Sequence, residues 1–581
     1  MTCDPENETG PQDDEVERLA RISAAVEAGD QRASLTAHDA YLQLKPAAGW
    51  AWNNAGLAAL ALGERAAAEY RFLRAVACPA FAERHMAHSN LSMVYLVDDW
   101  TVAADQAREA VRLAEHFGPG WWNLGNALMR GGRTREAVAA LENAARFSAD
   151  PPITQLYEAK RKACRWDGID LLEQQVIETA LAGHKDAPPF MAFTYAPTDA
   201  AQQLIIARRW AQIACRTPAP VWSKPRAADG RIRLGYLSAG FGEHATTRLL
   251  VNTIENHRRD RFEVIGFSTG PRRGPPSERR IMAAFDQFRP LFGLSDAQAA
   301  EIIRDCGIDI LMDVDGYTFG SRANILAQRP APVQVNYLAW PGTMGAPFID
   351  YVIADADVAP DPAAFSETVL YLDCYQPTDP SRTIGRTPSR ESLGLPPDGV
   401  VLASMNAAWK LNPRLLDVWA DILRRAPEAV LWQLADEESR EGLSLEARRR
   451  GIADRVIFAP LVDNPSHLAR IARADLALDP FPCGGHTTTS DLLWAGVPVL
   501  TKRGNSFCAN VSASLLRGVG LPRLVCETTD EYVAAASALI ADGDRRAALK
   551  AHLAGPGRTS RLFDNRCYVD ELETALLSIS P

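Results

Sequence analysis

The distribution of apolar residues divides the chain into two parts with different periodicities. Between about residues 15 and 150, apolar and alanine positions recur at helical spacing, and polar or glycine turns separate the segments. From Arg231 onward, short apolar runs alternate with helical segments, the first run being Ile232–Leu237. Such alternation predicts parallel β/α layers. We therefore expect a helical N-terminal part followed by an α/β part.

The helical part repeats along the sequence. Trp52–Tyr70 aligns with Trp121–Ala139, and a further copy lies between them. Asparagines at positions 54, 90 and 123 mark the three copies at intervals of 36 and 33 residues. These intervals bracket the period of tetratricopeptide helix pairs, which is roughly 34 residues. Stacked pairs form a superhelix with a concave surface that usually binds peptides or proteins, although the tryptophans are expected mainly to pack.

The β/α pattern runs through the second part twice and predicts two Rossmann-like halves. The strands predicted for the first half are Ile232–Leu237, Phe262–Phe267, Ile308–Asp313, Val333–Leu338 and Tyr351–Ala354. Those of the second half are Val400–Ser404, Ala429–Gln433, Arg455–Phe458 and Leu476–Leu478. Neither first strand is followed by a G-x-G-x-x-G fingerprint, which disfavours a nicotinamide or flavin dinucleotide. A ligand is expected between the halves, outside the carboxyl ends of the strands.

Composition narrows the class of protein. With 581 residues, 47% of them hydrophobic, the chain is long enough for several cores. Its formal net charge of −10 argues against a nucleic-acid binder, which normally carries a basic face. Ten cysteines without C-x-x-C spacing suggest neither a zinc site nor a disulfide framework, and fit a reducing cytoplasm. The acidic N-terminus lacks the features of a secretory signal, and no apolar run predicts a membrane span.

The densest candidate for chemistry follows the apolar run Ala474–Asp479. A Pro/Gly-rich turn leads to His486, Thr487 and Thr488, which should open a helix that ends at Gly496–Pro498, and a second strand follows through Val499–Thr501. The first amides of a helix are unpaired and its dipole is positive there, so this start would suit a phosphate. A plain helix cap is the alternative explanation, and this stretch alone does not decide between the two.

Other motifs occur in the order found in the O-linked N-acetylglucosaminyltransferases, and the chain resembles bacterial members with a short tetratricopeptide array over nearly its whole length. The motifs are Gly240–His244, Asp315–Thr318, Arg329–Gln334, Trp340–Gly345, Trp409–Pro413 and Gly485–Thr488 with Asp491 and Trp494. The resemblance implies a GT-B glycosyltransferase with a UDP-sugar in its cleft, inversion at the anomeric carbon, and neither metal nor other cofactor. Eukaryotic relatives transfer N-acetylglucosamine from UDP-GlcNAc to serine and threonine hydroxyls. The expected partners are therefore a UDP-sugar and a protein or peptide acceptor guided by the repeats.

The fold class expected is α plus α/β: a tetratricopeptide superhelix followed by a GT-B pair of doubly wound domains. The predicted divisions are a disordered acidic tail at 1–14, repeats at 15–150, a helical connector at 151–220, an N-terminal catalytic half at 221–390, a C-terminal UDP-binding half at 391–560, and a helix at 561–581 that crosses back to the first half.

The resemblance also assigns residues to the donor. In relatives, the counterparts of His486, Thr487 and Thr488 hold the diphosphate, that of Asp491 contacts the ribose, and that of His467 stacks on the uracil. Further positions implied to line the UDP-sugar site are Arg470, Cys483, Thr246, Leu338, Pro341 and Gly342.

Two residues are assigned to catalysis. Lys410 matches the family's phosphate-binding lysine, which would stabilise charge on the departing UDP. His244 opens a helix in the facing half and has a pKa suited to acid/base work near neutrality. The family has been argued to use this histidine, a nearby carboxylate or a donor phosphate oxygen as the base. Tyr317 and Arg322 are expected on the acceptor side, where an ordered loop that merely shapes the cleft is the alternative.

Three residues depart from the eukaryotic pattern. Gly240 stands where those enzymes carry an aspartate, which excludes a carboxylate base at that position. Asp199 replaces another histidine, and Ala407 replaces a glutamine that contacts the donor. Acceptor specificity and details of the donor site should therefore differ from those of the eukaryotic enzymes.

Rival interpretations remain open at this stage. Asp313-Val-Asp315 and Asp355-Ala-Asp357 are formally D-x-D strings, the metal-binding signature of another glycosyltransferase fold. Two restarting β/α halves argue against that single-domain fold. A different sugar or acceptor, such as glucose on asparagine, fits the same pattern, because sugar choice depends on a few contacts. A tetratricopeptide adaptor that binds UDP without turnover is the non-enzymatic alternative.

Overall fold

The computed structural model of the chain describes residues 11–215, 230–242, 244–271 and 276–581. Its contacts divide the chain into two compact units, one ending at Ala163 and one beginning at Cys164. Residues 1–10 of the predicted tail and the predicted boundary at residue 221 lie outside the described residues. None of the helices in the described ranges is long and apolar enough to cross a membrane.

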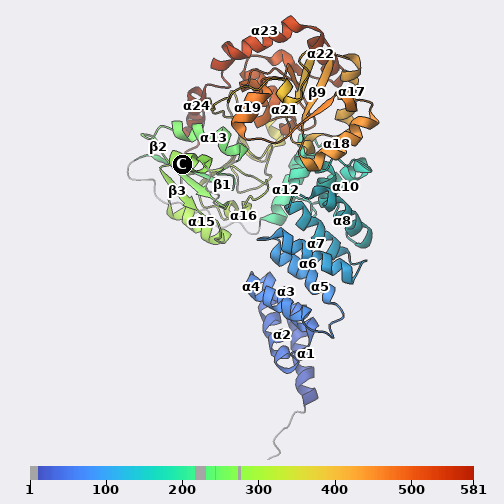
Figure 1. Cartoon of the computed structure of the whole chain (residues 1–581). Coiled ribbons are helices and arrows are strands. Elements are labelled where there is room, and N and C mark those ends of the chain that lie inside the picture. The colour runs from blue at the N-terminus through green and yellow to red at the C-terminus, as the bar shows by residue number, and fades with distance from the viewer. Residues whose placement is uncertain (1–10, 216–229, 243, 272–275) are drawn as a thin grey trace, which may run out of the picture. The chain divides into compact units, whose positions relative to one another are not determined.

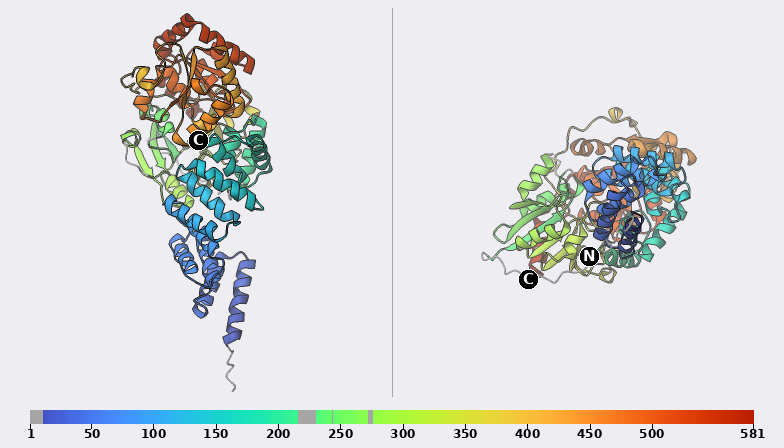
Figure 2. Two further views of the ribbon diagram at one scale, coloured as in Figure 1. Left: turned by 45° about the vertical axis from the view of Figure 1, so that its right-hand side comes forward. Right: turned by 90° about the horizontal axis from the view of Figure 1, so that it is seen from below.

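The first unit is entirely helical in the part described, and its helices pack in succession (Figure 2). They are α1 (Pro11–Glu27), α2 (Gln31–Leu44), α3 (Gly49–Ala61), α4 (Arg65–Val76), α5 (Arg84–Tyr95), α6 (Trp100–Leu113), α7 (Gly118–Arg130), α8 (Thr134–Phe147) and α9 (Ile153–Lys162). The three aligned copies correspond to the pairs α3–α4, α5–α6 and α7–α8. Because α1 begins at Pro11, the last residues of the predicted acidic tail are helical instead.

Small residues explain why these helices approach closely. A Cβ atom placed on Gly56 of α3 would lie 2.5 Å from the ring of Phe72 in α4. The equivalent Gly125 of α7 faces Leu141 of α8, which a Cβ would meet at 2.6 Å. Neighbouring copies are also joined through one marker asparagine, since Asn90 Nδ2 donates to Asn53 Oδ1 at 2.9 Å. The periodicity read from the sequence thus reflects contacts between paired helices.

The second unit contains two parallel sheets, as predicted. The first has the strand order β3-β2-β1-β4-β5-β6-β7 and the second the order β10-β9-β8-β11-β12-β13. The first is built from β1 (Ile232–Ser238), β2 (Phe262–Ser268), β3 (Gln287–Pro290), β4 (Ile310–Asp313), β5 (Val333–Asn336), β6 (Tyr351–Ala354) and β7 (Thr368–Tyr371). The second is built from β8 (Val400–Ser404), β9 (Ala429–Leu434), β10 (Val456–Ala459), β11 (Leu476–Leu478), β12 (Val499–Lys502) and β13 (Val525–Cys526). In each sheet the strands are added first on one side of the first strand and then on the other. This reversal of strand order leaves a crevice at the carboxyl ends of β1 and β4 in the first sheet, and of β8 and β11 in the second.

Helices flank both sheets. They include α10 (Ile169–Ala182), α11 (Pro189–Thr194), α12 (Ala200–Ala214), α13 (Ala245–Asn256), α14 (Pro276–Ala284), α15 (Asp296–Asp305), α19 (Asn464–Ile471), α20 (Thr487–Trp494), α21 (Phe507–Gly518), α23 (Gly543–Ala554) and α24 (Asn565–Ser578). The remaining ones are α16 (Ala323–Ala327), α17 (Pro413–Arg425), α18 (Glu437–Arg449) and α22 (Thr529–Ala541).

The strands without a predicted counterpart lie at sheet edges. β3 and β7 each have four residues, which are half-buried or exposed, and β13 has only two residues. An edge strand is covered on fewer sides than a central one, so it needs no continuous apolar run. The central strands, in contrast, are almost wholly buried, which is why their apolar runs stand out in the sequence.

The predicted connector differs from the observed structure. Helices α11 and α12 contribute Phe193, Ile206 and Ala207 to the core beneath the first sheet, where they pack with Leu237. The Phe193 ring lies 4.7 Å from that of Trp340, measured between centroids. This segment is therefore part of the first half. Its helices carry no repeat signal and precede the first strand, so sequence reasoning treated them as a spacer.

Helix α24 covers the opposite face of the first sheet and packs beside α13, as Figure 1 shows. Tyr568, Val569 and Leu572 join the core formed by Leu234 and Tyr236 of β1. The last helix of the chain thus returns to the first half, in the position predicted for it.

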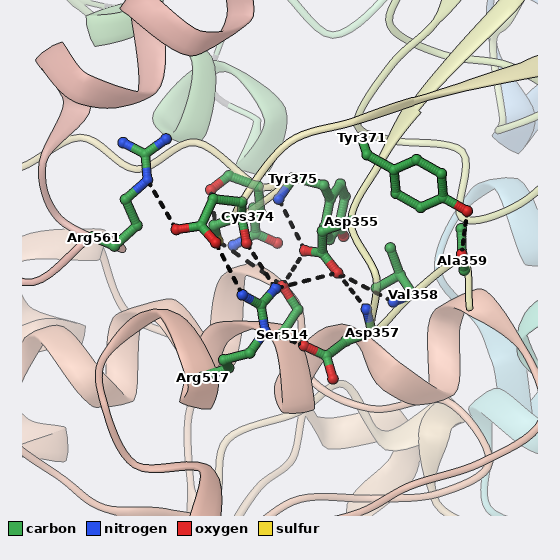
Figure 3. A network of polar contacts seen from close by, with 12 residues as sticks. Asp355, Asp357, Val358, Ala359, Tyr371, Cys374, Tyr375, Ser514, Arg517 and Arg561 are labelled. Atoms are coloured by element: carbon green, nitrogen blue, oxygen red, sulfur yellow. Dashed lines mark hydrogen bonds and ion pairs between the residues drawn. The ribbon is translucent and has the colours of Figure 1, made fainter.

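Buried polar contacts link the two halves of the second unit (Figure 3). Asp355, which follows β6, accepts hydrogen bonds from the amide of Tyr375 at 3.0 Å and from the Ser514 hydroxyl of α21 at 2.5 Å. Next to it, Asp357 pairs with Arg517 at 2.5 Å and with Arg503 at 3.1 Å. A segment of the first half is therefore anchored to α21 of the second.

Glu573 offers a test of the α24 contact. Its side chain is fully buried and accepts hydrogen bonds from His257 Nδ1 at 3.0 Å and from the Arg258 amide at 2.8 Å. Replacing Glu573 with alanine leaves these donors buried without an acceptor, which should cost about 3 kcal/mol and, in a unit of this size, lower the melting temperature by about 3 °C in calorimetry. Asp570→Ala, in the same helix but largely exposed, is the control. Equal melting temperatures for the two variants would contradict the assignment.

Candidate active site

The loops that follow β8 and β11 meet at the crevice of the second sheet. Lys410 lies in the loop after β8, and its Nζ donates to the carbonyl oxygen of Gly484, in the loop after β11. The half-buried lysine also lies over the ring of Trp409, 5.5 Å from its centroid. The structure thus brings together two motifs that are some 70 residues apart in the sequence.

A buried carboxylate organises the glycine turn. Asp479 Oδ1 accepts from the amide of Gly485 at 2.7 Å, and Oδ2 accepts from the hydroxyl of Thr501 at 2.8 Å. There is no space for a side chain at the second glycine, because a Cβ on Gly485 would lie 2.3 Å from Thr489 Oγ1. Burial raises the pKa of Asp479, while the hydrogen bonds and the nearby Lys410 oppose that shift. The turn therefore depends on glycine at this position.

Helix α20 begins where the sequence predicted it. His486 occupies the N-cap position, and within the described ranges no side chain caps the helix. The first amides consequently stay open, and Thr487 and Thr488 are half-buried beside them. The imidazole of His486 turns instead toward the Cys508 carbonyl oxygen, at 3.4 Å from Nε2. Open amides, two hydroxyl groups and Lys410 together make a site for an anion.

Two free cysteines lie directly behind this site. Cys483 precedes the glycine turn, and Cys508 is in the first turn of α21. The neighbouring Cys508, followed by Lys410 and His486, lowers the pKa of Cys483 against the effect of burial. The Cys508 thiol donates to the carbonyl oxygen of Phe193 at 2.9 Å. Through this contact, α11 of the first half touches the wall of the anion site.

His467 and Arg470 lie on α19 and share one environment. Arg470 is only 4% exposed, and an Arg470 guanidinium nitrogen lies 3.2 Å from His467 Nδ1. No carboxylate pairs with this guanidinium among the described residues, and its Nε lacks a partner there. Burial, followed by Arg470 and Arg248, lowers the pKa of His467 to about 4. The imidazole is therefore neutral at physiological pH, and the adjacent buried cation is available to an anionic or carbonyl-bearing ligand.

Asp491 is one turn into α20. Its Oδ1 accepts a hydrogen bond from Arg382, which lies in the segment that joins the two sheets. Burial raises the pKa of Asp491, and the cations of Arg382 and Arg248 oppose that shift. The residue predicted to bind a ribose is thus already paired with a cation.

His244 is the N-cap of α13 in the first half. Its Nδ1 accepts from the amide of Thr246 at 3.3 Å and lies 3.0 Å from the Thr246 hydroxyl. Surrounding protein atoms and the cation of Arg248 lower its pKa, although the side chain keeps an exposed face. The cation of Arg248, on α13, also lowers the pKa of His467 and opposes the raised pKa of Asp491, both of which belong to the second half.

The loop after β5 forms the other predicted wall. Leu338 has a φ of +78°, in the left-handed region that costs a leucine energy. Pro341 and Gly342 are buried, and a Cβ on Gly342 would lie 2.7 Å from the ring of Phe193. The hydroxyl of Thr343 donates to Glu367 at 2.6 Å. A strained residue and a tightly held glycine turn indicate a loop whose shape is set by its surroundings.

Tyr317 and Arg322, which are predicted for the acceptor side, both make internal contacts. The Tyr317 hydroxyl is buried and donates to the Met344 carbonyl oxygen at 2.9 Å. The guanidinium of Arg322 pairs with Asp296 at 2.6 Å and donates to carbonyl oxygens of the preceding loop. Both side chains thus stabilise the first half, a role that the resemblance did not indicate.

The residues that depart from the eukaryotic pattern also have local explanations. Gly240 leaves room beside His244, whose Nδ1 would lie 3.0 Å from a Cβ at position 240. Asp199 caps α12, since its side chain accepts from the amide of Gln202 at 2.8 Å. Ala407 is exposed next to the Lys410 loop. An aspartate at position 240 would place its carboxylate against His244, and this chain lacks that pair.

Sequence reasoning missed Arg248 and Arg382. Arg248 follows His244 by four residues on one helix, so their shared face could have been inferred from helical spacing. Arg382 lies in an irregular segment rich in proline and polar residues, where neither periodicity nor a motif marks it.

Comparison with known proteins agrees with this geometry. A model described as "Glycosyl transferase family 41" matches residues 195–375 and 379–572. A probable UDP-N-acetylglucosamine–peptide N-acetylglucosaminyltransferase of Arabidopsis thaliana is 32% identical over 408 residues, which are 66% of this chain and 42% of the relative. A Caenorhabditis elegans protein with the name UDP-N-acetylglucosamine–peptide N-acetylglucosaminyltransferase is 27% identical over 464 residues, 60% of this chain and 40% of that protein. The chain spans about two fifths of the length of these relatives.

A solved structure covers the chain more completely. A mutant O-GlcNAc transferase of Thermobaculum terrenum is 27% identical, with a TM-score of 0.66 over 98% of this chain and 97% of that one. The likeness therefore extends over both the helical repeats and the two sheets.

The lowered pKa of His467 can be tested directly. Since its pKa lies below the ordinary value of about 6.5, protonation is disfavoured in the folded protein, and the stability linked to the neutral form is fully present above about pH 6.5 and is lost progressively as pH falls from there to about 4. In NMR spectra of histidine-labelled protein, the His467 signal, assigned by its loss in His467→Gln, should stay constant from pH 8 to pH 5. In urea it should titrate near 6.5. A midpoint above 6 in the folded protein would contradict the burial of this imidazole.

Proposed function

Because the chain belongs to glycosyl transferase family 41, we propose that it is an inverting, metal-independent glycosyltransferase. In this proposal it moves N-acetylglucosamine from UDP-GlcNAc to a serine or threonine hydroxyl of a protein or peptide. The observation that carries the proposal is the convergence of Lys410 with the uncapped start of α20 at Gly484. The names of the relatives, which specify UDP-N-acetylglucosamine and a peptide, support this choice of donor and acceptor class.

The convergence suits the chemistry of the donor. Departure of UDP leaves negative charge on the β-phosphate, and groups already positioned around that charge lower the barrier. Lys410 would supply a full charge, and the amides of α20 would supply the positive end of a helix, with Thr487 and Thr488 as further donors. The buried Arg470 and the neutral imidazole of His467 would hold the uridine end.

The carboxylates that could suggest a metal have other partners. Asp313 accepts from the amides of Asp315 and Gly316, at 3.2 and 3.1 Å. Asp315 accepts from the Ser238 hydroxyl at 2.7 Å, and Asp355 from Ser514. The carboxylates of the two D-x-D sequences thus stabilise the turns that follow β4 and β6. This supports a mechanism in which cationic side chains and amides, rather than a metal held by these carboxylates, match the charge of the diphosphate.

The hydrogen bonding of His244 bears on the identity of the base. Since Nδ1 accepts from the Thr246 amide, the proton of the neutral imidazole is on Nε2, which makes Nε2 a donor. A donor at this position can bind a phosphate or sugar oxygen, but it does not accept the proton of the acceptor hydroxyl. With Gly240 in place of a carboxylate, the proposal assigns proton acceptance to an oxygen of the donor phosphate.

The acceptor is proposed to be a protein segment guided by the helical repeats, in a reducing cytoplasm. The nine cysteines that the structure describes are all free, which fits that setting.

Turnover assays test the function. Purified protein should release UDP from UDP-GlcNAc, and mass spectrometry of host proteins with and without the gene should reveal a hexosamine adduct on serine or threonine. Lys410→Met should lower the rate about 100-fold, whereas Lys185→Met, on an exposed loop, should not. UDP binding without turnover of any UDP-sugar would favour the non-enzymatic adaptor. A glucose adduct on asparagine would show that the donor sugar and the acceptor residue differ from those proposed. Activity that is lost with EDTA and restored by Mn²⁺ would overturn metal independence.

Variants of His244 separate a hydrogen-bond donor from a base. His244→Gln keeps an N–H group and should retain activity within about tenfold, while His244→Phe should lose about 100-fold. The comparison is made with saturating donor at constant pH, with His184→Gln as a control at a half-buried position away from the site. If glutamine is as damaging as phenylalanine, His244 accepts the proton and the assignment is wrong.

Gly485 tests the anion site itself. Gly485→Ala forces its Cβ against Thr489 and displaces the turn, so the affinity for UDP should fall about tenfold or more in calorimetric titrations. Gly543→Ala, at the start of α23, is the matched control, because its nearest contact is the flexible end of Arg546 at 3.6 Å. Unchanged affinity in Gly485→Ala would place the diphosphate elsewhere.

A further inference from the structure

The segment that joins the two sheets sends one side chain into the donor site. Arg382 reaches Asp491 of α20, and both side chains are almost completely buried, at 6% and 8% exposure. Another nitrogen of the guanidinium lies 3.4 Å from the Ser490 hydroxyl. A long, flexible cation in an irregular segment would ordinarily point to solvent. Its burial here against a carboxylate of the site indicates a defined task.

The surroundings of Arg382 fix its direction. Its Nε donates to the carbonyl oxygen of Asp379 at 2.9 Å. The carboxylate of Asp379 in turn binds Arg280 of α14 at 2.7 Å. The guanidinium also lies over the ring of Trp494, 5.6 Å from its centroid, and Arg558 lies over that ring at 3.9 Å. The side chain is thus held from the first half, through its own segment, and by an aromatic surface of α20.

The pairing uses only one of the two carboxylate oxygens. Arg382 donates to Oδ1 of Asp491, while Oδ2 has no hydrogen bond from any residue that the structure describes. An ionised carboxylate accepts from a sugar hydroxyl at either oxygen, provided that one oxygen is free and correctly turned. Burial alone would favour the neutral acid, which presents a proton to the ligand. The contact with Arg382 meets both conditions.

We propose that Arg382 is a positioning residue for the nucleotide: it keeps Asp491 ionised and turns the free oxygen toward a hydroxyl of the donor ribose. This inference rests on the proposed function, because it takes the guest of the site to be a ribonucleotide. It predicts that Arg382 affects the recognition of one ribose hydroxyl, and that its contribution disappears when that hydroxyl is absent. A role as a lid that blocks Asp491 predicts the opposite sign, since removal of the arginine would then tighten binding.

The test compares UDP with 2′-deoxy-UDP and 3′-deoxy-UDP by calorimetric titration. The intact protein should bind one of the deoxy analogues about tenfold more weakly than UDP. Arg382→Met should bind UDP about tenfold more weakly than the intact protein, yet should no longer distinguish UDP from that analogue. Arg382→Lys should restore part of the discrimination, because it retains the charge. Arg386→Met, an exposed arginine in the same segment, should behave like the intact protein.

A substitution of Asp491 distinguishes the proposed role of Arg382 from a purely structural effect of its removal. Asp491→Asn should lose the same discrimination, and combining it with Arg382→Met should cause little further loss. In turnover, Arg382→Met should raise the donor KM about tenfold and leave kcat within about threefold. Equal losses for UDP and both analogues, or unchanged or tighter binding of UDP, would overturn the inference. Failure of the intact protein to bind UDP at all would instead overturn the proposed function, and the inference with it.

Discussion

The hydrogen bonds of Asp479 are the interaction on which the site depends. This carboxylate is buried at the end of β11 and joins the Gly485 amide to the Thr501 hydroxyl of the neighbouring strand β12. It thereby fixes the turn that aims the first amides of α20 at the same point as Lys410. A buried carboxylate is costly unless its oxygens are satisfied, so the turn and the carboxylate stabilise each other. The anion site is accordingly built into the sheet and does not rest on a flexible loop.

Phe193 connects this site to the first half. Its carbonyl oxygen accepts from Cys508 beside the anion site, while its ring packs at a tilt against that of Trp340 and lies next to Gly342. A backbone bond from the Ala200 amide to Asn505, at 3.0 Å, adds a second link in the same region. One short helix therefore touches both predicted walls of the cleft. Together with the pairing of Asp357 with Arg517, these contacts define how the two halves meet.

The sequence predicts those parts of the molecule in which local chemistry and structure coincide. The start of α20 could be read from a strand, a glycine turn and threonines in immediate succession, and the repeats from small residues at positions where helices touch. The edge strands, and the packing of α11 and α12 against the first sheet, escaped prediction because their burial is decided by distant segments. For the same reason the buried contact of Tyr317 could not be predicted: its motif is local, but its hydroxyl partner, Met344, is contributed by a loop further along the chain. Arg382 shows the same limit for the site itself.

The charge distribution explains why the site should need its ligand. The chain as a whole carries a formal charge of −10, yet Lys410, Arg248, Arg382 and Arg470 gather around one crevice. Arg470 is buried without a carboxylate partner among the described residues, and an unpaired buried cation costs several kcal/mol. A diphosphate nucleotide would relieve part of that cost, so the binding of an anion should stabilise the second half by linkage. The local excess of positive charge would also attract an anionic donor to a surface that is acidic overall, which separates the recognition of the nucleotide from that of the acceptor.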